Sequence, residues 1–135
     1  MDFGNALDIS AAGMKAQGAR LRVIAENVAN ADATATTPGG EPFRRKTILF
    51  ESEFDKALGA ELVAIKGVQP DKSDFGRDFR PGHPAADAEG YVLTSNVNTL
   101  IEMTDMREAQ RSYEANLRVM RTVRQMLEQT VSILR

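Results

Sequence analysis

The chain of 135 residues contains no cysteine, no tryptophan, a single histidine and only 6% aromatic residues. Without cysteine it can form neither a disulfide framework nor a thiolate metal site, and it has no thiol nucleophile. The scarcity of aromatic residues predicts a core of aliphatic side chains and methionine. The net charge of −2 provides no general attraction to nucleic acid or to an anionic membrane.

Long apolar runs are missing as well. No stretch approaches the roughly 18 apolar residues that a membrane-spanning helix requires, so we expect no direct membrane span. Residues 1–5 include neither a basic region nor a continuous apolar segment, and we expect no signal peptide of the Sec type. The length favours one domain over two complete cores.

The residues that could carry chemistry are isolated from one another. His83 stands in a Pro-Gly-His-Pro turn without a second histidine or a cysteine to share a metal or to activate a nucleophile. Residues 71–76 loosely resemble a calcium loop, but Phe75 occupies a ligand position and Gly82 stands where the twelfth residue should be glutamate. Arg44-Arg45-Lys46 is a short basic patch without interleaved aromatic residues. We therefore predict no cofactor, no metal, no nucleic-acid partner and no enzymatic activity.

The chain does have a stripe of bulky apolar residues at each end, repeating every seven positions. This spacing keeps side chains on one face of a helix and is typical of a seam that packs against a partner helix. The N-terminal stripe comprises Leu7, Met14, Leu21 and Val28. The C-terminal stripe comprises Met106, Tyr113, Met120, Leu127 and Leu134.

The stripes predict one helix over residues 4–31 and another over residues 99–134. Asn5 is placed to cap the first helix, and Thr99-Leu100-Ile101-Glu102 fits a capping box at the start of the second. The second helix would be roughly 50 Å long at about 1.5 Å per residue, which exceeds what a globule of this size can cover. We expect the helices to pair within the chain and to make lateral contacts with other molecules. Positions four residues after stripe members are small, which would allow a close approach there: Ala11, Gly18 and Ala25.

The sequence between the helices indicates short β-strands separated by turns. The strand-like runs are residues 47–50, 61–68, 75–79 and 91–93. We predict two or three short antiparallel strands or one long hairpin, too small to be stable alone. The predicted fold is α+β: long N- and C-terminal helices pair as an antiparallel coiled coil (residues 1–31 with 99–135) around a small β-rich middle region (residues 32–98).

Motifs distributed along the chain carry a resemblance to a known family. The N-terminal ones are Ile9-Ser10-Ala11-Ala12-Gly13-Met14-Lys15-Ala16-Gln17 and Ala25-Glu26-Asn27-Val28-Ala29-Asn30. The middle ones are Pro38-Gly39-Gly40-Glu41-Pro42-Phe43-Arg44-Arg45, Pro81-Gly82-His83-Pro84 and Asn96-Val97-Asn98. The C-terminal one is Ala109-x-Arg111-Ser112-Tyr113-x-Ala115-Asn116. In this order they resemble the bacterial flagellar rod and hook proteins, and among these the proximal-rod members.

The resemblance implies a structural subunit of the flagellar basal-body rod. Such a subunit polymerises with other rod proteins and with copies of itself into the axial drive shaft, with the terminal helices inside a helical tube and the β-rich middle outside. It is exported unfolded through the flagellar type III apparatus, without a cleaved signal peptide, into a rod that crosses the periplasm. The resemblance also adds Asn27, Asn30 and Asn116 to the stripe residues as candidate assembly-interface positions, the first two as amides that hold backbone near the helix end.

Two other function classes remain open. A small coiled-coil regulator or chaperone that forms a closed dimer would account for the stripes, although not for the middle region punctuated by proline and glycine. An enzyme would require a constellation of reactive residues that the sequence does not display.

Overall fold

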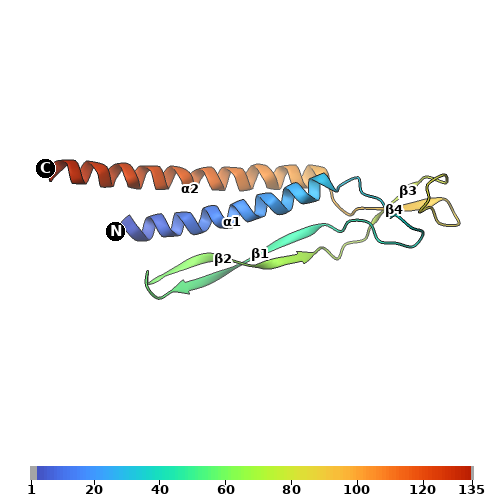
Figure 1. Ribbon diagram of the computed structural model, residues 1–135, viewed down its shortest axis with the longest axis horizontal. Helices are drawn as coiled ribbons and strands as arrows, with labels where there is room; N and C mark the ends of the chain where they lie inside the picture. The colour runs from blue at the N-terminus through green and yellow to red at the C-terminus, as the bar shows by residue number, and fades with distance from the viewer. Residues whose placement is uncertain (1–2, 135) are drawn as a thin grey trace. The chain divides into compact units, whose positions relative to one another are not determined.

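The computed structural model describes residues 3–134. Its elements are α1 (Phe3–Ala29), β1 (Lys46–Asp55), β2 (Ala60–Pro70), β3 (Gly76–Phe79), β4 (Tyr91–Thr94) and α2 (Thr99–Ile133), as Figure 1 shows. The fold is α+β, as predicted, with two long helices and two hairpins between them. None of the described helices is long and apolar enough to cross a membrane. Met1, Asp2 and Arg135, which the predicted helical region includes, lie outside the described residues.

The chain forms two compact units, and each contains part of both helices. Unit 1 comprises the described residues up to Leu21, Ile48–Gly67, and the residues from Arg107 onward. Unit 2 comprises Arg22–Thr47 and Val68–Met106. Most of the β1–β2 hairpin therefore belongs to unit 1, and the β3–β4 hairpin belongs to unit 2.

In unit 1, α1 and α2 lie side by side and run antiparallel (Figure 1). Gly13 faces Asn116 so closely that a Cβ atom at position 13 would lie 2.8 Å from Asn116 Nδ2. Further along α1, the Arg20 guanidinium lies 3.6 Å from the Glu108 carboxylate. The partner on α2 thus moves toward the N-terminus of α2 as the chain advances along α1.

The residues of α2 that pack most closely are not the bulky stripe. A seven-residue repeat of smaller or polar side chains forms the seam: Glu102, Ala109, Asn116 and Val123. Three stripe residues follow these by four positions each and are half-buried: Met106, Tyr113 and Met120. The bulky residues therefore flank the seam, while short side chains at its centre let the helices approach closely.

On α1, too, the small residues that pack closely are not the ones that the sequence predicted. Ala11 and Ala25 are exposed, and Gly18 faces open space. Ala16 and Ala19 are buried instead, and with Gly13 they occupy the packed side of α1.

The start of α2 differs from the expected capping box. Asn98, rather than Thr99, caps the helix: its Oδ1 accepts hydrogen bonds from Leu100 N (3.0 Å) and Ile101 N (3.3 Å). The Glu102 carboxylate does not reach back to the cap, because it bonds to residues outside the helix.

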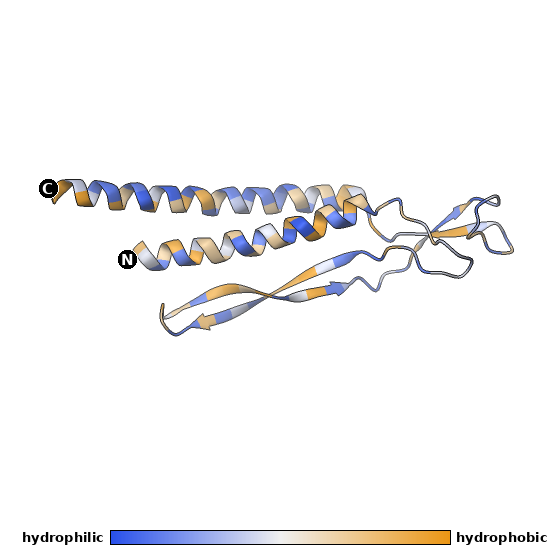
Figure 2. Ribbon diagram, in the orientation of Figure 1, coloured by the Kyte–Doolittle hydropathy of each residue, from blue (hydrophilic) through white to orange (hydrophobic). Residues whose placement is uncertain are grey.

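The β1–β2 hairpin runs beside α1 (Figure 1). Asn5 lies within α1 rather than at its cap, and its Nδ2 donates to Leu58 O at the hairpin tip (3.1 Å). Gly59 closes the turn with φ 63°, and its N–H donates to Asp55 O (2.8 Å). The two strands form a long hairpin, which was one of the two alternatives that the sequence predicted, and Figure 2 shows apolar and polar residues interspersed along both.

The β3–β4 hairpin supplies the small core of unit 2. Its antiparallel register runs from Gly76 opposite Thr94 to Phe79 opposite Tyr91. The buried apolar residues around it are Ala35, Ala85 and Val92. The middle region thus consists of two antiparallel hairpins, one long and one short, where the sequence predicted one long hairpin or two or three short strands.

Candidate functional site

The structure leaves surface available on all nine stripe residues. Seven are half-buried: Leu7, Met14, Leu21, Val28, Met106, Tyr113 and Met120. Leu127 and Leu134 are 37% and 82% exposed. The register that sets Gly13 against Asn116 places Leu127 and Leu134 beyond Phe3, where the described part of α1 no longer covers them.

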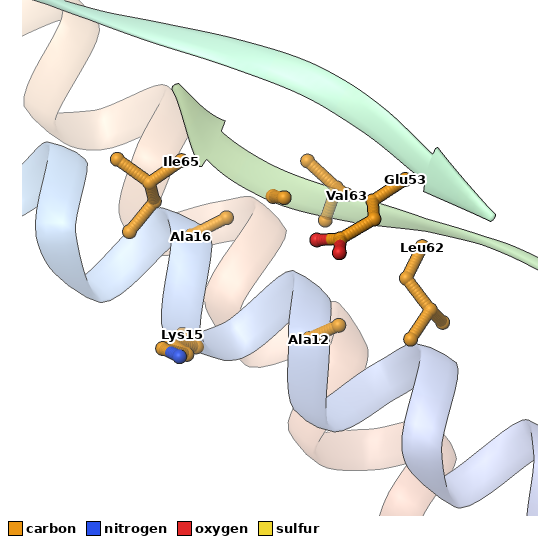
Figure 3. A pocket seen from close by; sticks show the side chains of 8 residues that line it. Ala12, Lys15, Ala16, Glu53, Leu62, Val63 and Ile65 are labelled. Carbon is orange, nitrogen blue, oxygen red and sulfur yellow. The ribbon is translucent and has the colours of Figure 1, made fainter. Parts of the chain in front are cut away.

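A groove of about 350 Å³ lies between α1 and the β1–β2 hairpin in unit 1 (Figure 3). Its lining is Ala12, Lys15, Ala16, Glu53, Leu62, Val63, Ala64 and Ile65. Apolar side chains from β2 face short side chains on α1, and one lysine and one glutamate are its charged groups. In the described part of the chain, no group of three or more histidine, cysteine or acidic side chains could hold a metal. The groove is mostly apolar, and its lining shows how the β1–β2 hairpin packs along α1 within unit 1.

A group of polar side chains joined by hydrogen bonds lies in unit 2. We call it the polar junction, and it consists of Asn27, Arg45, Asp71, Asn96 and Glu102. These residues come from the last turns of α1, the segment before β1, the segment after β2, the segment before α2, and the first turn of α2. Five separate stretches of chain are thus joined by side-chain hydrogen bonds.

Asn27 uses its whole amide in this junction. Its Nδ2 donates to Lys46 O (2.8 Å) and to Glu102 Oε2 (3.0 Å), and its Oδ1 accepts from Lys46 N (2.9 Å). The side chain is 1% exposed and pairs with the peptide of Lys46 much as a neighbouring strand would. Asn27 therefore holds the start of β1, whereas Asn30 holds the helix end by donating to Glu26 O (2.8 Å).

The charges of the junction converge on Arg45. Its Nε lies 2.5 Å from Glu102 Oε1, and its two terminal nitrogens lie 3.1 Å from Asp71 Oδ2 and 3.6 Å from Asp105 Oδ2. Glu102 is completely buried, and a buried carboxylate is tolerated only when it is paired and hydrogen-bonded. Partial burial acts to lower the pKa of the Arg45 guanidinium, but its bonds to Glu102 and Asp71 outweigh this effect and raise the pKa.

Asp71 and Asn96 complete the junction. Hydrogen bonds from the backbone and hydroxyl of Ser73, and then from Arg45, lower the pKa of Asp71. Asn96 Oδ1 accepts from Arg45 N (2.7 Å), and its Nδ2 donates to Ser73 Oγ (2.9 Å). Both residues thereby fix the backbone on either side of the β1–β2 hairpin.

The side chains of the basic patch, Arg44, Arg45 and Lys46, form their contacts within the chain. The Arg44 guanidinium donates to Asp71 O and Ser73 O, 3.0 Å each, and stacks 4.0 Å from the Phe75 ring. Lys46 Nζ lies 2.5 Å from Glu26 Oε1. Since Arg45 is paired with Glu102 and Asp71, each of the three basic residues has a partner within the chain.

Sequence reasoning did not identify Glu102 as part of a site. A signal was present, because this carboxylate stands among Leu100, Ile101 and Met103. An acidic residue inside an apolar helical turn requires a partner if it is buried, and that partner, Arg45, lies 57 residues earlier in the chain.

The isolated histidine and a neighbouring aspartate serve the loop between β3 and β4. His83 is a turn residue, as expected, and its Nδ1 accepts a hydrogen bond from Ala85 N (3.1 Å). Asp87 Oδ1 accepts from Tyr91 N (2.9 Å) and Glu89 N (3.0 Å), and the bond from Tyr91 is the main cause that lowers the pKa of Asp87. Both side chains order the backbone of this loop.

Comparison with known proteins relates this chain to one protein family. A family model described as "Flagella basal body rod protein" matches residues 7–35, and one described as "Flagellar basal body rod FlgEFG protein C-terminal" matches residues 88–133. The chain is 49% identical to the flagellar basal-body rod protein FlgC of Agrobacterium fabrum over 127 residues, which cover 94% of this chain and 91% of the relative. It is 36% identical to FlgC of Salmonella typhimurium over 129 residues and 35% identical to FlgC of Bacillus subtilis over 144 residues, each covering 96% of both chains.

Proposed function

This chain belongs to the FlgC family of flagellar basal-body rod proteins and is a structural subunit of the rod, and from that premise we propose that it polymerises into the proximal part of the axial drive shaft. Its neighbours there are other rod proteins and further copies of itself. The observation that carries the proposal is the similarity to FlgC over nearly the full length of the chain. In this role the subunit transmits torque through mechanical continuity and catalyses no reaction.

The exposed parts of the helices support assembly through the ends of the chain. Leu127 and Leu134 extend apolar surface beyond the described part of α1, and the other stripe residues flank the seam without being fully buried. Contacts with neighbouring subunits would remove this surface from water, at about 25 cal/mol for each Å² of apolar area. We propose that the helical regions (residues 1–31 and 99–135) form the inner layer of a tube and that the middle region (residues 32–98) lies outside it.

Three amides belong to the proposed interface for a different reason. Asn27 and Asn30 order the backbone at the end of α1, and Asn116 faces Gly13 in the helix seam. Their side chains set how the helices and β1 are held within one subunit. They would therefore act on assembly by fixing the shape of the surface that a neighbour contacts.

The composition of the core is compatible with export through the flagellar type III apparatus, which we propose as the route out of the cytoplasm without a cleaved signal peptide. The buried apolar residues of the described chain are mostly alanines: Ala16, Ala19, Ala35, Ala85 and Ala109, beside Ile24, Val92 and Val123. Small side chains bury little apolar area, so this core contributes little free energy against unfolding. A chain that must be threaded unfolded benefits from such a core, and the assembled rod crossing the periplasm would then supply the missing stabilisation.

A strain that lacks its own copy of this gene provides the test. Cells receive either the wild-type chain, a Leu127→Asp/Leu134→Asp variant, or a Gln125→Asp/Gln129→Asp variant in which the same charge is added at exposed polar positions of the same helix. We expect motility and rod-containing basal bodies with the wild type and the glutamine variant, and neither with the leucine variant. Normal motility with the leucine variant would contradict the proposed interface.

A further inference from the structure

The outward face of α2 carries a ridge of arginine side chains. The ridge consists of Arg107, Arg111, Arg118 and Arg121, all of them exposed. Their spacings of four, seven and three residues keep them on one side of the helix. Arg111 follows the buried Glu102, and Arg118 follows the buried Ala109, by nine residues each, which is about two and a half turns. The ridge therefore points away from the seam that packs on α1.

Little within the chain compensates the charge of this ridge. The Arg118 guanidinium lies 4.0 Å from Glu114, with the two side chains 80% and 65% exposed, and such a pair contributes little free energy. Arg107, Arg111 and Arg121 form no ion pair with any described residue. A row of like charges on one helix face is unfavourable unless a partner neutralises it.

The tip half of the β1–β2 hairpin has the opposite charge. Between positions 51 and 61 there are four carboxylates and one lysine: Glu51, Glu53, Asp55 and Glu61, with Lys56. Among them the three glutamates are exposed. Two aromatic residues in the same strand are also exposed, Phe50 and Phe54, the latter by 59%. Because side chains alternate along a strand, Glu51 and Glu53 lie on the opposite face of β1 from these rings, and Glu53 lines the groove beside α1. Ser52 shares the face of the rings and donates to Glu61 Oε2 (2.9 Å), so the tip presents Glu61 together with Phe50 and Phe54.

We propose that the arginine ridge of one copy binds the hairpin tip of the next copy of this chain. The inference rests on the proposed function, because it specifies the contact between copies that the rod requires. Arginine suits this partner in two ways, since its planar group pairs with carboxylates and stacks on aromatic rings. Charge complementarity thus selects a second copy as the occupant of the ridge.

The placement of the two surfaces sets the type of assembly. The ridge faces away from α1, the hairpin tip is tied to α1 through Asn5 and Leu58, and no ion pair joins ridge and tip within the described residues. Because the contact uses two different surfaces, it is heterologous and leaves one of each free at the ends of a row. Such a contact extends from copy to copy into a row or a ring and does not stop at a two-fold symmetric dimer.

Sedimentation velocity of the purified full chain tests the proposal. One variant removes two of the four ridge charges (Arg118→Gln/Arg121→Gln) and another removes two of the four tip carboxylates (Glu51→Gln/Glu61→Gln), while Arg22→Gln/Lys72→Gln removes two exposed charges outside both surfaces. We expect the wild type and the control to associate with rising concentration at low ionic strength, and high salt to reverse this. The association constant of each surface variant alone should be lower than that of the wild type by about tenfold or more.

A mixture of the two surface variants provides the sharper result. Each retains the surface that the other has lost, so the mixture should form a 1:1 complex and nothing larger. Circular dichroism of each variant and of the wild type, compared at a concentration low enough that all are monomeric, establishes that the substitutions leave the helix content of the monomer unchanged. A wild-type chain that stays monomeric, a control that weakens association as much as the surface variants do, or a mixture that does not form the 1:1 complex would overturn the proposal.

The failure of this inference is distinguishable from failure of the proposed function. If the ridge variant associates like the wild type while the labelled chain is still found in rods, the rod function stands and this contact is wrong. If the labelled chain is absent from rods that are otherwise complete, the rod function itself is wrong.

Discussion

The polar junction predicts that Glu102 matters far more for stability than its neighbour Asp105, although both face Arg45. In Glu102→Gln the shape is preserved and the charge is lost. The new amide oxygen can accept from only one of the two donors, Asn27 Nδ2 and Arg45 Nε, while its NH₂ group faces the other donor. A buried pair is thereby broken and a buried donor is left without an acceptor.

The structure sets the size of the effect. Removing one partner from a buried ion pair costs about 3–5 kcal/mol. The Arg45 side chain is 21% exposed and keeps Asp71 at 3.1 Å, so we expect about 2–3 kcal/mol for Glu102→Gln. Asp105 lies 3.6 Å from Arg45 and is 30% exposed, and Asp105→Asn should cost less than about 1 kcal/mol.

Urea unfolding followed by helix circular dichroism measures both variants against the wild type. With an m-value of about 2 kcal/mol per molar urea, the midpoint for Glu102→Gln should fall by about 1–1.5 M. The midpoint for Asp105→Asn should shift by less than about 0.5 M. Both substitutions remove one negative charge from the same helix, so a general electrostatic effect would move them equally. Equal shifts, or a larger one for Asp105→Asn, would refute the role assigned to the junction.

Three further predictions follow from the same structure. Gly13→Ala should lower the unfolding midpoint in urea, because its Cβ would lie 2.8 Å from Asn116 Nδ2. Position 18 faces open space, so Gly18→Ala should stabilise the helix by about 1 kcal/mol. The opposite order of the two midpoints would be incompatible with the seam. The pKa of Asp71 lies below its ordinary value of 3.8, so the contribution of Asp71 to stability is present above pH 3.8 and is lost as the pH falls further. The melting temperature of the wild type should therefore drop in acid. An Asp71→Asn variant with the same pH dependence as the wild type would speak against this contribution. The dilute chain should show less helix by circular dichroism than α1 and α2 together contain, and more as its concentration rises; full helix content at every concentration would show that the helices need no neighbour.

Local patterns in the sequence were sufficient to predict the secondary structure. Seven-residue spacing located α1 and α2, and runs of strand-forming residues bounded by proline and glycine located β1 to β4. These signals depend on residues close together in the chain. The family resemblance rested on motifs of the same local kind.

The contacts between distant segments could not be predicted in the same way. The stripes indicated two packing helices, but α2 packs through Ala109 and Asn116, because the closest approach favours short side chains over bulky ones. The junction was missed for a related reason: Asn27 and Glu102 are 75 residues apart, and neither forms a recognisable motif with the other. Pairing between such residues is decided by the tertiary fold.

The central claim is that this chain is a component of the flagellar rod. Electron cryomicroscopy of basal bodies purified from cells whose only copy of this gene encodes a labelled chain tests it most directly. We predict that the label lies on the rod and that cells without the gene contain no complete rod. Complete rods that lack the label would contradict the account.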